Sequence, residues 1–197
     1  MSTSLAIIKT NNAPEILKLS NLIMNSSKNQ NNNTIIGLRK IIKIIQKETS
    51  TTKLEIYEYN YLVSKKFRYL CEEAIENTEI LLIVVNIFDK KCFDNLKLLI
   101  NEIIKYKNNV QRNVNDNGNN IGFNSTSEIT LNKKIRFLLL KTTNNFLMKI
   151  TESSSLISAK TEITNLFKII KNLNYKFVEV DIDEIKETNN LLTEIIN

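Results

Sequence analysis

The stretch Ile80-Leu-Leu-Ile-Val-Val-Asn-Ile87 constrains the fold more than any other part of the chain. It contains a single polar residue and several β-branched ones, which is typical of a strand buried on both faces, as in a parallel sheet. After a polar turn around Asp89 and Asp94, apolar residues recur at helical spacing from Phe93 to Ile104. The pattern predicts a buried strand, a loop and an amphipathic helix, which is half of a βαβ unit.

Strands and helices alternate along the rest of the chain. Further strands are predicted at Leu5–Ile8, at 34–45 and 53–59 as a hairpin, at Ile135–Leu140 and at Lys176–Val180. Further helices are predicted from Pro14 to Met24, from Lys65 to Glu76, from Ser158 to Leu173, and after Asp183, which is a candidate cap for the last of them. Two Asn-rich segments, 25–33 and 108–132, are predicted to be flexible loops.

This alternation predicts an α/β fold of three layers in a single domain over 1–197. We expect a mostly parallel six-stranded sheet, with one antiparallel edge strand from the hairpin and helices on both faces. No run of about 18 apolar residues occurs, so no membrane-spanning helix is expected. The first residues, Met-Ser-Thr-Ser-Leu, lack the features of a signal peptide.

The composition excludes several kinds of active site. The chain has no His, which rules out Ser-His-Asp and Cys-His catalysis. Its 2 cysteines, Cys71 and Cys92, form no CxxC pair and are too few to bind zinc. We expect them to be buried thiols in a reducing compartment. No catalytic, cofactor-binding or metal-binding residue is therefore predicted.

The charged residues leave alternatives open. The formal net charge is +6, with basic clusters at Arg39-Lys40, at Lys65-Lys66 with Arg68, and at Lys133-Lys134 with Arg136. A solvated surface is favoured over a patch for nucleic acid or an acidic partner. For the acidic cluster of Asp181, Asp183 and Glu184, helix capping is favoured over cation binding.

Tyr57, Tyr59 and Tyr61 alternate along one predicted strand, so they face one side of it. They form either a partner-binding patch, since Tyr is enriched at interfaces, or ordinary packing of the hairpin. Packing is favoured over the patch.

The order of the predicted elements is that of Ras-like small GTPases, and short pieces of sequence resemble parts of that family. Thr34-Ile-Ile-Gly37 resembles the start of their second strand, and Lys53-Leu-Glu-Ile-Tyr-Glu58 resembles the strand that leads into their Asp-x-x-Gly motif. Val84-Val-Asn-Ile-Phe-Asp89 with Phe93-Asp-Asn-Leu96 resembles the next strand and the start of its helix.

The phosphate-binding turn departs from this resemblance. A P-loop has the pattern G-x-x-x-x-G-K-[ST], whose backbone N–H groups cradle phosphates while its Lys neutralises charge and its hydroxyl holds Mg²⁺. The matching register here is Lys9-Thr-Asn-Asn-Ala-Pro-Glu-Ile16. Both glycines are missing, Pro14 has no N–H, and Glu15 puts an anion where phosphate would lie. We therefore expect this turn to bind no triphosphate.

Three further nucleotide motifs are replaced as well. The Asp-x-x-Gly region reads Glu58-Tyr-Asn-Tyr61 and lacks the glycine. The place of the Asn-Lys-x-Asp guanine reader holds Lys141-Thr-Thr-Asn-Asn145, and the place of the Ser-Ala-Lys loop holds Asp181-Ile-Asp183. The loss of all these motifs predicts a fold that is kept without its ligand.

The chain also resembles a narrower family, that of centromere protein M, a kinetochore component described as a pseudo-GTPase. The resemblance lies in Thr3–Ile8 with Ala13–Met24, in Val84–Ile87 with its helix, in Lys134–Leu138 and in Phe177–Asp181. It implies a non-catalytic scaffold of the inner kinetochore in the nucleus, without bound nucleotide. It further implies docking to centromere protein I, beside centromere proteins H and K, and a role in chromosome segregation.

Two other functions stay open. The first is a diverged Rab-like or Ras-like protein in membrane traffic or signalling, which is disfavoured because the last residues, Glu194-Ile-Ile-Asn197, contain no prenylation cysteine. The second is an active NTPase with an unusual loop, which is the least favoured. Direct contact with DNA is left open by the basic clusters.

Overall fold

The computed structural model describes residues 2–10, 13–25, 33–35, 38–47, 50–59, 77–89, 91–101, 134–141, 146–168, 174–185 and 187–197. The elements in chain order are β1 (Ser2–Lys9), α1 (Pro14–Asn25), β2 (Asn33–Ile35), β3 (Leu38–Lys47), β4 (Ser50–Tyr59), β5 (Ile80–Asn86), a helix over 91–101, β6 (Lys134–Lys141), α4 (Phe146–Phe167), β7 (Asn174–Asp181), the 3-10 helix η2 (Ile182–Glu184) and α5 (Thr188–Ile196).

All described strands belong to one sheet, in the order β2-β3-β4-β1-β5-β6-β7. The neighbouring pairs β4–β1, β1–β5, β5–β6 and β6–β7 are parallel. β3 runs antiparallel to both β2 and β4. The predicted α/β class is confirmed, with its six strands in a mostly parallel sheet and an antiparallel strand from the hairpin. The short strand β2 is a seventh strand that the sequence did not predict.

The hairpin differs in detail from the prediction. The expected strand 34–45 is divided into β2 and β3, which are antiparallel to each other, with Ile35 opposite Leu38. The pair of β3 and β4 continues to Lys47 opposite Ser50, so the strands take up most of the predicted connection 46–52. Thr51 and Thr52 extend β4 because β-branched residues are favoured in strands. Beyond the part that β2 covers, β3 forms one edge of the described sheet.

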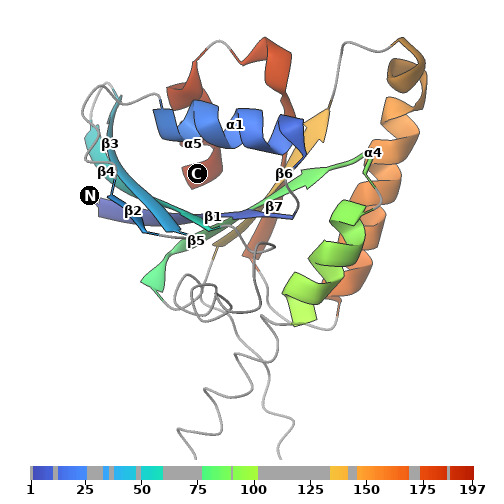
Figure 1. The fold of residues 1–197 in the computed structure, drawn as a ribbon, viewed down its shortest axis with the longest axis horizontal. Coiled ribbons are helices and arrows are strands. Elements are labelled where there is room, and N and C mark those ends of the chain that lie inside the picture. Colours follow the sequence, from blue (N-terminus) through green and yellow to red (C-terminus); the bar gives the residue numbers. More distant parts are fainter. Residues whose placement is uncertain are drawn as a thin grey trace, which may run out of the picture.

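Helices cover both faces of the sheet (Figure 1). α1 and α5 lie over one face, and the 91–101 helix and α4 lie against the other. Because both faces are covered at the centre, β5 is buried along its whole length, as the sequence predicted. Leu5, Ala6, Ile7 and Ile8 of β1 are also fully buried beside it.

The helices agree with the predictions in part. α1 is confirmed, but α4 begins at Phe146 instead of Ser158, because the Ser-rich stretch before Leu156 hides the helical pattern. The predicted helix 65–76, the loop 108–132 and the loop segment 26–32 lie outside the described residues. Asn25 ends α1 and Asn33 begins β2. No helix in the described part of the chain is both long enough and apolar enough to span a membrane.

Candidate functional site

The carboxyl ends of the parallel strands are where α/β sheets commonly bind their ligands. At this edge β1 ends with Lys9, and the neighbouring strand β4 carries Glu58 one residue before its end. Both side chains lie on the face of the sheet that α1 covers, because Glu58 contacts Ser20 of α1 and Lys9 contacts Glu58. The residues of this site therefore come from the part of the chain that the P-loop comparison singles out.

The site is a buried ion cluster centred on Glu58. Lys9 Nζ lies 2.8 Å from Glu58 Oε1, and only 8% and 10% of the two side chains are exposed. The hydroxyl of Ser20, which is buried in α1, also donates to Glu58 Oε1. Arg39 Nη1 lies 3.8 Å from Glu58 Oε2 and 3.4 Å from the side-chain oxygen of Asn21, which it contacts as a donor.

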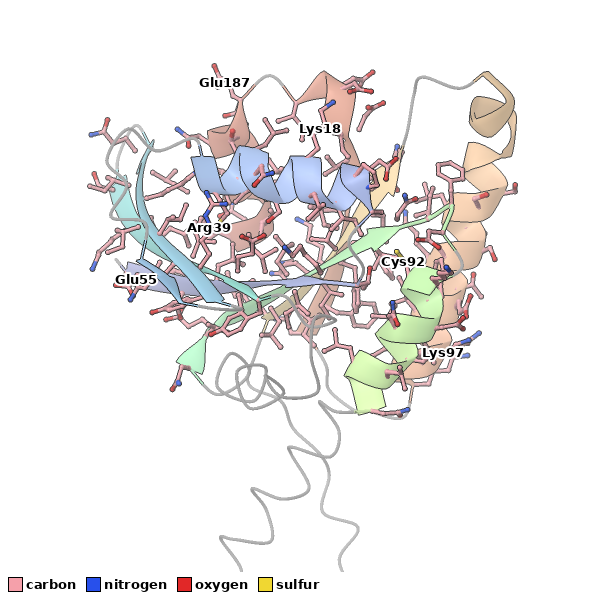
Figure 2. The ribbon with its side chains drawn as sticks, in the orientation of Figure 1. Lys18, Arg39, Glu55, Cys92, Lys97 and Glu187 are labelled. Carbon is pink, nitrogen blue, oxygen red and sulfur yellow. The ribbon has the colours of Figure 1, made fainter. Side chains whose placement is uncertain are left out.

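This cluster connects four elements through one carboxylate. Lys9 belongs to β1, Arg39 to β3, Glu58 to β4 and Ser20 to α1. In Figure 2 Arg39 lies beneath α1, which agrees with its contacts. A buried carboxylate is stable only when it is neutralised and hydrogen-bonded, and these partners meet both needs. The cluster stabilises the packing of these elements, and the Lys9 ammonium and the Glu58 carboxylate are both bonded within it.

The turn after β1 offers little to an anion. α1 begins at Pro14, which has no N–H to donate, and its first turn contains Glu15, whose charge repels phosphate. Lys9, the first residue of the P-loop register, points into the cluster instead of toward a bound phosphate. The described residues of this turn, with Pro14 and Glu15 at the start of α1, therefore do not favour a bound triphosphate.

A second set of polar contacts lies just beyond the carboxyl ends of the paired strands β1 and β5, which lead to helices on opposite faces of the sheet. Such a position is the usual ligand crevice of an open α/β sheet. Here the Thr10 hydroxyl donates to the carbonyl of Val84 at 2.7 Å, and the Asn95 side-chain amide donates to the carbonyl of Thr10 at 2.7 Å. The hydroxyl and the carbonyl of Thr10 are thus both hydrogen-bonded within the protein.

The loop after β5 is closed in the same way. Asn86 Oδ1 accepts from the N–H of Phe88 at 3.0 Å, and Asp89 Oδ1 accepts from the N–H of Lys91 at 2.9 Å. Cys92 is fully buried, and its burial raises the pKa of its thiol above the ordinary value. A raised pKa keeps the sulfur in its unreactive thiol form. The prediction of a buried cysteine is confirmed for Cys92, and Cys71 lies outside the described residues.

The acidic cluster near the C-terminus is structural. Asp181 Oδ1 accepts from the N–H of Asp183 at 3.0 Å and caps η2, which confirms capping for this cluster. Asp183 is not the cap of the last helix that the sequence suggested, because the N-cap of α5 is Glu187, whose side chain makes no capping bond. Asp183 instead pairs with Lys18 of α1 at 2.6 Å. The described residues include no group of three or more potential metal ligands.

The described residues of the basic clusters, Arg39, Lys40, Lys134 and Arg136, are engaged within the protein. Arg136 is buried, and its Nε donates to the carbonyl of Ile195 at 3.1 Å near the end of α5. Burial lowers the pKa of Arg136. Lys134 Nζ lies 3.4 Å from the carbonyl of Ile196, and Lys40 pairs with Glu55 at 3.1 Å. Lys65, Lys66, Arg68 and Lys133 lie outside the described residues.

The tyrosines pack within the hairpin. Tyr59 is buried, and Tyr57 is half-buried with its hydroxyl donating to Glu55 Oε2 at 3.0 Å. Lys40 Nζ lies 4.7 Å from the centre of the Tyr57 ring. The favoured interpretation, packing, therefore holds for these two residues, and Tyr61 lies outside the described residues.

The sequence analysis missed one residue of interest, Lys43 of β3. It is only 5% exposed, and its Nζ is buried without a hydrogen-bond partner. Burial lowers its pKa from 10.5 to about 8. The signal was available, because strand alternation puts Lys43 on the same side as the apolar Ile41 and Ile45.

The comparisons with known proteins give no family. No protein-family model matches this chain, and no curated protein matches it. The assignment therefore depends on the residues themselves.

Proposed function

We propose that this chain is a non-catalytic docking domain with a Ras-like fold whose nucleotide site is replaced by an internal ion cluster. Its role is that of a pseudo-GTPase scaffold of the inner kinetochore, similar to centromere protein M. The observation that carries the non-catalytic part is the Lys9–Glu58 pair with its hydrogen bond from Ser20.

The arrangement of strands supports the Ras-like part of the proposal. A central β1 lies between β4 and β5 in a mostly parallel sheet, and a hairpin supplies the antiparallel strand β3. α1 follows β1 directly and covers it. This is the order of elements along the chain on which the resemblance to small GTPases depends.

The chemistry at the β1–α1 turn supports the loss of the nucleotide. Any triphosphate there would meet Glu15 at the start of α1 and would compete with Glu58 for Lys9. Two like charges about 4 Å apart repel by roughly 4 kcal/mol at an effective dielectric constant of 20. A nucleotide site would need a cation at the position that Glu15 occupies. Without a nucleotide to hold, the fold is available for contacts with other proteins.

Isothermal titration with GTP, GDP and ATP in the presence of Mg²⁺ tests the loss of the nucleotide. We expect no binding tighter than about 1 mM, which corresponds to about −4 kcal/mol. A thermal melt with each nucleotide is the second measurement, because a ligand that binds only the folded state raises the melting temperature. Micromolar binding in either experiment would contradict the proposal.

The kinetochore role comes from the family resemblance and is tested in dividing cells. A tagged copy is expected to form paired nuclear dots through mitosis and to recover centromere protein I, together with centromere proteins H and K, in a pull-down. Vesicular staining with recovery of coat factors would instead favour the role in membrane traffic.

A further inference from the structure

The outer edge of β3 is open over most of its length within the part of the chain that the structure describes. β2 pairs only with Leu38, Arg39 and Lys40. Residues 41–47 pair with β4 on their inner side, and no described strand meets their outer side. Such an edge presents backbone N–H and C=O groups that can pair with a further strand.

The two faces of this edge differ in character. Ile42 and Ile44 point away from α1 and are 46% and 65% exposed. Ile41, Lys43 and Ile45 alternate with them on the α1 side and are buried. A strand added at this edge would therefore meet exposed apolar side chains on one face and the buried Lys43 on the other.

Among the residues that the structure describes, Lys43 contacts no group of opposite charge. Its partner on the neighbouring strand is Leu54, and the adjacent positions on its own face of β3 are Ile41 and Ile45. Its Nζ makes no hydrogen bond. An unpaired ammonium in apolar surroundings is unfavourable, and a carboxylate brought next to it would relieve that penalty.

We propose that residues 41–47 of β3 accept an extended segment of a partner protein as an added strand. The segment places a carboxylate opposite Lys43 and apolar side chains beside Ile42 and Ile44. Side chains directly opposite each other on neighbouring strands have Cβ atoms about 4.5–5.5 Å apart, which is within reach of an ion pair. Backbone hydrogen bonds supply affinity in this mode of binding, and alternate side chains supply specificity.

The same residues disfavour a second copy of this chain as the occupant. A twofold axis perpendicular to the sheet at this edge would pair β3 of one copy antiparallel with β3 of the other. The α1 faces of the two copies would then lie on the same side of the joined sheet. The α1-facing positions of β3 from 39 to 45 are Arg39, Ile41, Lys43 and Ile45, none of which is acidic. Self-pairing would leave Lys43 without a carboxylate, which is how an inward-pointing charge protects a sheet edge.

This inference depends on the proposed docking role only in requiring a protein partner, and the two tests are separate. The nucleotide titration concerns the turn between β1 and α1. The peptide titration described next concerns the opposite border of the hairpin. Either one can fail while the other succeeds.

Two fluorescein-labelled peptides test the proposal by fluorescence anisotropy with the full chain. The first is Thr-Val-Thr-Val-Glu-Val-Thr-Val-Thr, with fluorescein on its N-terminal amine and an amidated C-terminus, and the second has Gln in place of Glu. We expect the Glu peptide to bind at least about tenfold more tightly, because only a carboxylate neutralises Lys43. In Lys43→Met this ratio is expected to fall to about one.

Lys40→Met is the matched control, because Lys40 lies on the same strand but on the opposite face, where it pairs with Glu55. It is expected to keep the preference for the Glu peptide. Urea unfolding of each variant verifies the fold. Equal binding of the two peptides, a preference that survives Lys43→Met, or no binding at about 1 mM would overturn the proposal.

Sedimentation of the full chain tests the other occupant. We expect a monomer at about 100 µM, a concentration at which micromolar self-association would be visible. A dimer that is dissociated by Ile44→Asp would show that β3 pairs with a second copy, and would overturn the assignment of an acidic partner.

Discussion

Lys9 and Glu58 form a buried ion pair at 2.8 Å across the ends of two neighbouring parallel strands. The residues are 49 positions apart in the chain, and their contact depends on β1 lying beside β4. Burying two charges is costly, and only good geometry with additional hydrogen bonds repays it. Ser20 of α1 and Arg39 of β3 provide these further contacts to Glu58. The ion pair and its neighbours therefore hold α1 and the hairpin against β1.

The first prediction concerns Glu58→Gln, which removes the charge but keeps the shape of the side chain. Lys9 would be left buried without a counter-ion, so we expect a loss of about 3–5 kcal/mol in the free energy of unfolding, measured by urea denaturation. Glu55→Gln is the control, because Glu55 pairs with Lys40 and Lys53 on the more exposed face and should cost below about 1 kcal/mol. Figure 2 shows Glu55 away from α1, on the outer side of the hairpin.

A double variant strengthens this test. Lys9→Met combined with Glu58→Leu removes both charges and should recover most of the stability lost in Glu58→Gln. Equal costs for Glu58→Gln and Glu55→Gln would mean that the buried pair has no special role.

The second prediction concerns the pH dependence that Lys43 causes. Its pKa is about 8 in the folded chain and about 10.5 when exposed, so between these values the unfolded state binds one more proton. Stability attributable to Lys43 therefore rises with pH through this range, by up to about 3 kcal/mol, and the full penalty is present below pH 8. Lys43→Met is expected to be more stable than the native chain at pH 7.

The measurement is the difference in unfolding free energy between Lys43→Met and the native chain from pH 7 to pH 10.5. This difference should shrink by up to about 3 kcal/mol as the pH rises, because native Lys43 becomes neutral in both states. Lys40→Met removes an exposed ammonium whose pKa is raised by Tyr57 and Glu55, and should show no such gain at pH 7. A pH-independent difference would contradict a lowered pKa at Lys43.

The third prediction concerns Arg136, which holds the end of α5 against β6. Arg136→Met leaves the carbonyl of Ile195 without its buried donor, and should cost about 1–3 kcal/mol. We expect the loss to be concentrated in α5, where hydrogen exchange of the backbone amides should accelerate more than in β5. Lys134→Met is the control, since the longer contact of the exposed Lys134 should contribute less than about 0.5 kcal/mol. Uniform acceleration across the sheet would argue against this local role.

The fourth prediction concerns the thiol of Cys92. Its burial and raised pKa should slow its reaction with a thiol reagent by at least about a hundredfold relative to the unfolded chain. The measurement uses a Cys71→Ser background, so that the reaction reports Cys92 alone. Fast labelling under native conditions would show that the region between β1 and β5 opens readily.

Several features were predictable because they depend on local patterns. The apolar run at Ile80–Asn86 is a fully buried strand, and the helical spacing after Pro14 marks α1 with nearly correct ends. The division of 34–45 into β2 and β3 was missed, because Thr34, Ile35 and Ile41 all favour strands and the periodicity does not show where the chain reverses. The start of α4 was missed because serines compete locally for backbone hydrogen bonds.

The site was predictable only in part. The replacement of the P-loop residues is visible from Lys9 to Ile16 without any structure. That Lys9 pairs with Glu58, that Arg136 holds α5 and that Lys43 stays unpaired could not be derived from spacing. These facts depend on which strands are neighbours, and the apolar patterns of β1, β5 and β6 resemble one another too closely to determine that order.

The α/β class, the central buried strand and the missing phosphate-binding pattern are therefore readable from the chain before it folds. Which polar groups are buried, and which of them meet, becomes known only once the strands are placed in the sheet. Periodicity reports the side of an element on which a residue lies, whereas a long-range ion pair requires two strands to be placed next to each other. Lys9 and Glu58 show the second kind of information, and the run at Ile80–Asn86 shows the first.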